Sequence, residues 1–149
     1  MPLSAAQRGL WFAQQVASDA PLSISHYVDI SGALDTGALE AAGNRAAAEL
    51  GTGHLRIVLV DGHPMQYVDP DMWIDLEVID LRTEPDPAGT ADRWMKAQSR
   101  APMELVDAPL MSSPVLRLAD ERYYWFARIH HIALDGIGAV NLVGRVAEL

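Results

Sequence analysis

Residues 115–138 read VLRLADERYYWFARIHHIALDGIG, and this stretch decides the fold. Val115–Ala119 and Arg122–His131 are rich in apolar and aromatic residues and are separated by an Asp-Glu turn, which predicts two consecutive strands. Side chains of a strand point alternately to opposite faces, and the second segment is mostly apolar at both parities. We therefore expect Arg122–His131 to be a central strand that is covered on both faces.

Helical and strand patterns alternate along the rest of the chain. Ser4–Gln7 has the pattern of a capping box, so a helix is expected from there to about Val16, closed by the turn at 18–21. A second helix is expected from Asp35 to about Leu50, ended by Gly51-Thr52-Gly53. Further strands are expected at 26–30, 55–60, 64–68 and 74–78, a helix at 91–100, and irregular chain at 85–89 and 102–114.

A last helix is expected after Ile137. Its apolar residues recur every three positions, at Val140, Val143, Val146 and Leu149, and the sequence stops on that stripe. We expect the stripe to be one apolar face that a further part of a longer protein covers.

Composition excludes several classes of protein. The chain has 149 residues, 11 Lys+Arg against 20 Asp+Glu, a formal net charge of −9 and no cysteine. An acidic balance disfavours nucleic-acid binding, and without cysteine there is no disulfide, thiolate nucleophile or cysteine-bound zinc. No apolar run approaches the ~20 residues of a membrane span, and the N-terminus lacks a signal-peptide pattern. We expect a soluble, cytoplasmic domain with no nucleic-acid or membrane partner.

The residues that could take part in chemistry are His130, His131, Asp135 and Gly136. Adjacent histidines of a strand point to opposite faces, so we expect one to be packed and the other to face a cavity. An imidazole can hold or take a proton near neutral pH. Asp135 lies where it can support the turn after the strand, and a buried carboxylate there would need an arginine partner. Gly136 lets the backbone enter a helix and leaves an N–H exposed near the histidine.

Simpler interpretations of these residues stay open. A His-His pair at a strand end is often a satisfied core pair, and Asp-Gly is a common turn. Zinc binding by His130, His131 and Asp135 is disfavoured because adjacent strand side chains diverge, so no metal site is expected. His26, His54 and His63 are expected at the surface or in turns.

Two motifs resemble those of one enzyme family. His130–Gly136 matches the His-His-x-x-x-Asp-Gly core motif of nonribosomal peptide synthetase condensation domains, and Leu3–Trp11 resembles the first motif of that family. Shorter segments at 26–28, 55–56, 80–83 and 123–125 are similar to a condensation domain of siderophore biosynthesis. The chloramphenicol acetyltransferase superfamily shares the His-x-x-x-Asp-Gly part. The family's second motif survives only as Leu55-Arg56, because Gly51-Thr52-Gly53 stands where the family has Arg-His-Glu.

This resemblance implies a fold and an activity. The fold would be a chloramphenicol acetyltransferase-like lobe, a two-layer α/β sandwich with a mixed sheet flanked by helices. Residues 1–149 would form the N-terminal lobe of a condensation domain, with the second lobe outside this chain. His131 would hold or deprotonate the amine that attacks an acyl thioester. Asp135 would shape the loop through Arg56, with Arg128 as the competing partner, and His130 and Gly136 would support the site.

The resemblance also implies partners. The donor and acceptor would arrive on 4′-phosphopantetheine arms of carrier protein domains, with no cofactor attached to this chain, and an adenylation domain would adjoin it. Three alternatives remain: a stand-alone CoA-dependent acyltransferase, an epimerisation domain, and a non-catalytic platform that recruits partners.

Overall fold

The computed structural model describes residues 1–17, 20–51 and 53–149, so Ser18, Asp19 and Thr52 of the expected turns lie outside the described residues. Four helices are formed: α1 (Ala5–Val16), α2 (Thr36–Leu50), α3 (Pro87–Arg100) and α4 (Gly136–Glu148). The strands are β1 (Ser23–Ser31), β2 (Leu55–Val60), β3 (His63–Val68), β4 (Val78–Asp80), β5 (Met111–Ser112), β6 (Val115–Ala119) and β7 (Arg122–His130). Each helix begins at a side-chain cap, and the four caps are Ser4, Asp35, Asp86 and Asp135.

The main sheet is mixed and has β7 at its centre. Its order is β1-β7-β6-β4, and β5 also pairs with β7. All of these pairs are antiparallel except β4 with β6, which is parallel. Every residue of β7 after Arg122 is buried, so the prediction of a doubly covered central strand is confirmed. β2 and β3 form a separate hairpin whose turn residues Asp61 and Gly62 have positive φ angles of 51° and 78°.

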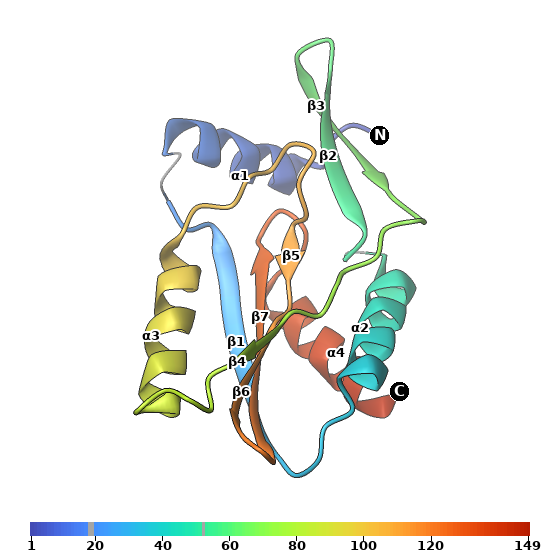
Figure 1. Ribbon diagram of the computed structural model, residues 1–149. Helices are drawn as coiled ribbons and strands as arrows, with labels where there is room; N and C mark the ends of the chain where they lie inside the picture. The colour runs from blue at the N-terminus through green and yellow to red at the C-terminus, as the bar shows by residue number, and fades with distance from the viewer. Residues whose placement is uncertain (18–19, 52) are drawn as a thin grey trace.

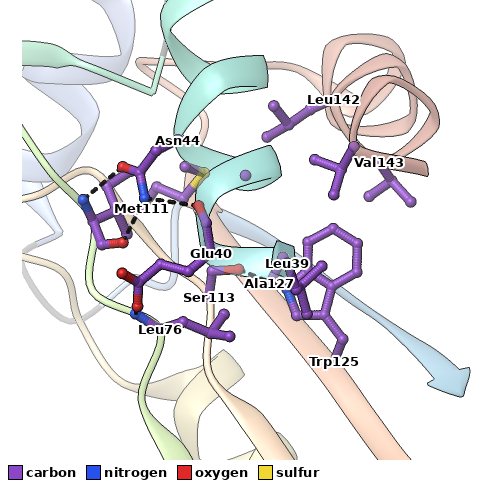
Figure 2. A pocket seen from close by; sticks show the side chains of 13 residues that line it. Leu39, Glu40, Asn44, Leu76, Met111, Ser113, Trp125, Ala127, Leu142 and Val143 are labelled. Carbon is purple, nitrogen blue, oxygen red and sulfur yellow. Dashed lines mark hydrogen bonds between the residues drawn. The ribbon is translucent and has the colours of Figure 1, made fainter. Parts of the chain in front are cut away.

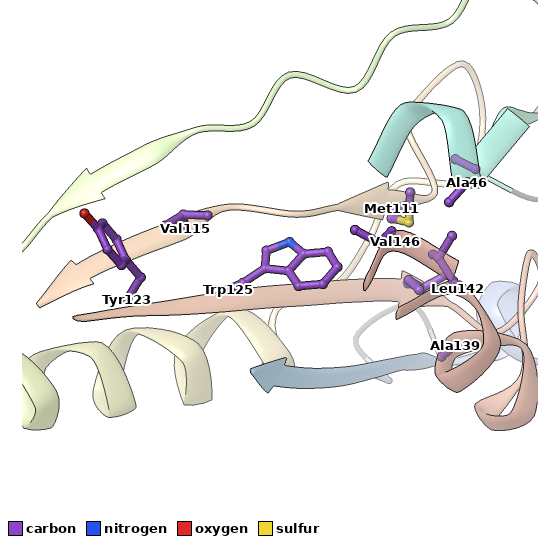
Figure 3. Packing of buried hydrophobic residues seen from close by; sticks show 10 residues of the cluster. Ala46, Met111, Val115, Tyr123, Trp125, Ala139, Leu142 and Val146 are labelled. Atoms are coloured by element: carbon purple, nitrogen blue, oxygen red, sulfur yellow. The ribbon is translucent and has the colours of Figure 1, made fainter. Parts of the chain in front are cut away.

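Helices cover both faces of the sheet (Figure 1). On one face α2 and α4 pack against alternate residues of β7, including Trp125 and Ile129 (Figure 3). On the other face α3 packs against Tyr124 and Phe126. The predicted mixed sheet flanked by helices is confirmed, but the sandwich has three layers instead of two, because β7 is apolar at both parities.

A third apolar cluster lies where β7 ends. It joins α1, the hairpin and the first residues after the strand, and its buried members are Leu3, Leu55, Ile57, Leu105, Leu110 and Ile132. In Figure 1, α1 runs across this end of the sheet beside the hairpin. The cluster therefore fixes α1 against the segment that follows the two histidines.

The strand predicted at 74–78 is wrong, and its alternation of inward and outward side chains holds only for residues 74–77, because Val78 is exposed. Asn44 of α2 accepts a hydrogen bond from the Ile74 N–H at 2.8 Å and donates to the Ile74 carbonyl at 2.9 Å. Glu40 accepts from the Leu76 N–H at 2.9 Å. These side chains replace a neighbouring strand, so pairing begins only at Val78.

The apolar face predicted on the last helix is also wrong. Val140 is 71% exposed and Leu149 is 41% exposed. The face buried against α2 consists of Ala139, Leu142 and Val146. A strict three-residue spacing turns by ~60° per step around a helix, so Val140 and Leu149 lie on opposite sides.

Other elements also differ from the expectation, and β1 begins at Ser23 where 26 was expected. α3 begins at Pro87 within the expected loop, because Asp86 accepts from the Gly89 N–H at 3.0 Å and proline is tolerated in the first turn. Met111–Ser112 pairs with β7 inside the stretch expected to be irregular.

Candidate active site

The two histidines lie in different environments, because β7 ends at His130, one residue before the expected end, and His131 is the first residue of the turn that follows. His130 is 1% exposed and is among the largest fully buried side chains, whereas His131 is exposed. The His131 main chain is fixed by its N–H, which donates to the Leu22 carbonyl at 2.9 Å. The structure therefore leaves His131 as the histidine that an external substrate can reach.

His130 is held as a neutral imidazole. Its Nδ1 accepts a hydrogen bond from the Ile132 N–H at 3.0 Å, so the ring proton is assigned to Nε2, which lies 3.4 Å from Gln14 Oε1. Burial, with smaller contributions from the nearby charges of His131 and Arg128, lowers the pKa of His130 to about 4. At neutral pH this side chain is a packed hydrogen-bonding group.

Asp135 and Arg56 are not paired. Asp135 is exposed and caps α4, where its Oδ1 accepts from the Gly138 N–H at 2.8 Å. Arg56 lies near a different carboxylate, with its Nε 3.8 Å from Asp69 Oδ2. The expected buried Asp135–Arg56 pair is wrong for this chain, because a carboxylate at a helix N-terminus is stabilised by free N–H groups and solvent and needs no arginine.

Arg128, the alternative expected partner of Asp135, binds other groups. It is 5% exposed, donates to Ser23 Oγ at 3.2 Å and to the Ala101 carbonyl, and has no carboxylate partner among the described residues. Desolvation lowers its pKa from the ordinary value. Arg128 therefore joins β1 to the end of α3 on the face away from α4.

Glycine is needed at a different position of the turn from the one expected. A Cβ on Gly136 would meet Ile24 Cδ1 at 3.5 Å, an ordinary contact. A Cβ on Gly138 would lie 2.6 Å from Leu134 Cδ1, so that position is closed to a side chain unless Leu134 moves. Gly136 still begins α4, as expected.

Sequence reasoning missed three polar features near this end of the fold. Gln7, expected only as part of the capping box, also donates from Nε2 to the Ile132 carbonyl at 3.1 Å. Gln14, on the same helix, lies against His130. His54 lies in a turn, as expected, but it is only 6% exposed, and its burial was not expected. The sequence signal for the glutamines is their seven-residue spacing, which places them on one side of α1.

A small apolar cavity of about 30 Å³ lies between α2, α4 and the sheet (Figure 2). Trp125 lines it and donates from Nε1 to Ser113 Oγ at 2.7 Å, and Glu40 and Asn44 fix its outer wall. A larger cleft of about 240 Å³ opens beside Arg56 and Trp73. His131 lines neither of these two hollows.

The described residues hold neither a metal cluster nor a membrane-spanning helix. No group of three or more His, Asp or Glu side chains among them could hold a metal ion. Within the same residues, every helix is too short or too polar to cross a membrane.

The chain matches known proteins over its whole length. A family model described as "Condensation domain" matches residues 1–149. The chain is 38% identical over 147 residues to the dimodular nonribosomal peptide synthase of Bacillus subtilis, which covers 98% of this chain and 6% of that protein. It is 33% identical over 152 residues to enterobactin synthase component F of Escherichia coli K12, which covers all of this chain and 12% of that protein.

Solved structures of condensation domains are also similar to this chain. The starter condensation domain of the rhizomide synthetase RzmA superposes with a TM-score of 0.89 at 34% identity, covering 97% of this chain and 35% of that one. The first condensation domain of the CDA synthetase gives a TM-score of 0.83 at 28% identity, covering 99% and 39%.

A mixed sheet flanked by helices, with tandem histidines at the end of its central strand and a capped helix after them, has the chloramphenicol acetyltransferase-like fold of these condensation domains. The chain belongs to the condensation domain family of nonribosomal peptide synthetases. It spans about a tenth or less of the length of the curated relatives and about a third of the solved condensation domains.

Proposed function

We propose that this chain is the N-terminal lobe of a condensation domain that joins a carrier-bound acyl or peptidyl thioester to the amine of a carrier-bound aminoacyl group. The observation that supports this most directly is the contrast between the two histidines: only His131 is exposed, and it stands at the end of the central strand. In the reaction, the amine nitrogen bonds to the thioester carbonyl carbon, the C–S bond breaks, and the amine proton leaves with the departing thiol.

In this proposal His131 contacts the acceptor amine. A neutral imidazole accepts a hydrogen bond from the amine, which orients the nitrogen toward the thioester, and it can also take the proton. Both substrates are tethered by 4′-phosphopantetheine arms of partner carrier domains, and such proximity itself supplies part of the rate. An adenylation domain would supply the aminoacyl group.

The second lobe is the proposed cover for exposed apolar residues near His131. Ile137 and Val140, on the first turns of α4, are 74% and 71% exposed. The structural relatives are about three times longer than this chain, which supports a missing lobe as the occupant. We therefore expect the isolated 149 residues to form no amide product, because a one-sided site cannot exclude water or hold both thioesters.

The test uses the full-length synthetase that contains this chain, with both carriers loaded. We expect His131→Ala to lower the rate of amide formation ~10²–10⁴-fold, the usual effect of losing a general acid–base group. His63→Ala is the matched control, since His63 is an exposed histidine on the hairpin. Near wild-type rates for His131→Ala would refute the proposed role.

A second candidate concerns the donor. The starter condensation domain of RzmA, 35% identical to this chain in one of its structures, was solved in complex with C8-CoA. That observation favours a soluble acyl-CoA as donor. This chain is also 37% identical to the isonitrile lipopeptide synthase of Streptomyces coeruleorubidus. Supplying octanoyl-CoA in place of the loaded donor carrier distinguishes the two donors. Exchange of the acceptor Cα proton without amide formation would indicate an epimerisation domain, and neither reaction would indicate a non-catalytic platform.

A further inference from the structure

Two glutamines on one side of α1 reach the main chain and the ring that flank His131. Gln7 and Gln14 are seven residues apart, a rotation of ~700°, so their side chains leave the helix in nearly the same direction. Gln7 Nε2 donates to the Ile132 carbonyl at 3.1 Å, and Gln14 Oε1 lies 3.4 Å from His130 Nε2. α1 therefore contacts the residue before His131 and the residue after it.

The Gln7 amide has no alternative orientation in this setting. Besides its bond to Ile132, Nε2 donates to Gln66 Oε1 at 2.7 Å. Its Oε1 accepts from Gln66 Nε2 at 2.9 Å and from the Ser4 N–H at 2.9 Å. Both N–H groups and both lone pairs of one side chain are thus used. Turning the amide over would place its oxygen against the Ile132 carbonyl.

The peptide groups around His131 are held on each side. The Ile132 N–H donates to His130 Nδ1 at 3.0 Å, and the His131 N–H donates to the Leu22 carbonyl at 2.9 Å. Gln7 completes this set by binding the Ile132 carbonyl across 125 positions of sequence. His131 follows the last residue of β7, so the next peptide group lies outside the strand.

We propose that Gln7 is a positioning residue for His131, acting by fixing the Ile132 peptide group that follows it. The inference rests on the proposed role of His131 in amide formation. Misplacement of a reacting group by about 1 Å can cost ~100-fold in rate. Loss of the Gln7 donor therefore lowers kcat and leaves substrate binding, which depends on other surfaces, unchanged.

The sharpest variant is Gln7→Glu. A glutamate in the third helical position can still accept from the Ser4 N–H, so the capping box is retained. It has no donor for the Ile132 carbonyl and brings a negative charge close to that oxygen. The matched control is Gln15→Glu, which makes the same change of charge at an exposed position of the same helix. Gln7→Met, which has neither donor nor charge, serves as the second variant.

The first measurement is amide hydrogen exchange by NMR in the 149-residue chain. We expect Gln7→Glu and Gln7→Met to accelerate exchange at Ile132 and His131 at least tenfold, with no change in Gln15→Glu. Unchanged exchange at both amides would overturn the proposal whatever happens to activity.

The second measurement is steady-state kinetics of the full-length synthetase with loaded carriers. We expect both Gln7 variants to lower kcat 10- to 100-fold at an unchanged KM for the carriers. A rise in KM at constant kcat would overturn the positioning role. The proposed function fails on its own if His131→Ala is as active as the wild type while the Gln7 variants still accelerate amide exchange at Ile132.

Discussion

Acidification should destabilise this chain through His130. The unfolded imidazole has a pKa near 6.5, whereas burial lowers the folded value to about 4. Between these values the unfolded state binds more protons, so the free energy of unfolding falls as the pH falls from about 6.5 to about 4 and is level above that window for this group. At 1.36 kcal/mol for each tenfold change in proton affinity, the full effect is up to about 3 kcal/mol.

The hydrogen bonds give the same direction. In the folded state Nδ1 accepts from the Ile132 N–H at 3.0 Å, and a protonated ring would put two donors face to face there. His131 and Arg128 also disfavour a positive charge on His130. Acid therefore has to break this bond or unfold the end of β7.

The assay is urea unfolding of the 149-residue chain at pH 7 and at pH 4.5, for the wild type and for His130→Asn. The asparagine oxygen can replace Nδ1 as an acceptor but does not titrate in this range. Carboxylates such as Asp80, whose pKa is lowered to about 2 chiefly by its hydrogen bonds with Arg82, are common to both proteins and cancel in the difference. We expect the wild type to lose about 2–3 kcal/mol more than the variant. Equal losses in the two proteins would refute the assignment of His130 as a buried neutral group.

Substitutions at three further positions test the turn and the core. Asp135→Ala should lower the free energy of unfolding by about 1 kcal/mol and Asp135→Asn by only a few tenths, because asparagine caps a helix as well as aspartate does; a loss of about 3–5 kcal/mol for Asp135→Asn, measured by urea unfolding, would instead indicate a buried ion pair. Gly53→Ala should cost about 1–3 kcal/mol, since its Cβ would overlap Ala47 and lie 3.2 Å from Met111 Cε. Gly43 lies in the middle of α2 with nothing within 4 Å of an added Cβ, so Gly43→Ala should instead raise the free energy of unfolding by about 0.5–1 kcal/mol. Equal thermal midpoints for these two glycine variants would contradict the reasoning.

Local patterns predicted the elements that depend on local physics. The capping box of α1 is present, with Ser4 and Gln7 bonded in both directions. α2 ends at Gly51 with a φ of 68°, and the Asp61-Gly62 turn joins β2 to β3 as predicted. Each of these features is determined by residues within a few positions of one another, so a single sequence contains the information.

Features that depend on distant residues were not predictable in this way. Ile74 and Leu76 have the alternation of a strand, but their main-chain groups bind Asn44 and Glu40, about 30 positions earlier. No pattern near residue 74 indicates which side chains of α2 will face it. The bond between Gln7 and Ile132 joins positions that are still further apart.

The expectation for Asp135 failed for a different reason. It assumed that the carboxylate is buried, and burial alone would require an arginine. In the folded chain Asp135 is exposed at the first turn of α4, where the Gly138 N–H satisfies it. Arg56 lies near Asp69 instead. Asp135 thus stabilises the turn without a counter-charge.

The arrangement of the two histidines limits what each can do chemically. A general base that works near neutral pH needs a free nitrogen and a pKa close to the ambient pH. His130 has neither, because Nδ1 accepts the Ile132 N–H, Nε2 faces Gln14, and its pKa is about 4. His130 is the last residue of β7 and is buried, whereas His131 is the first residue of the following turn and is exposed. If this chain takes part in proton transfer at neutral pH, His131 is therefore the histidine of the pair that can do so, and His130 contributes by binding the Ile132 N–H next to it.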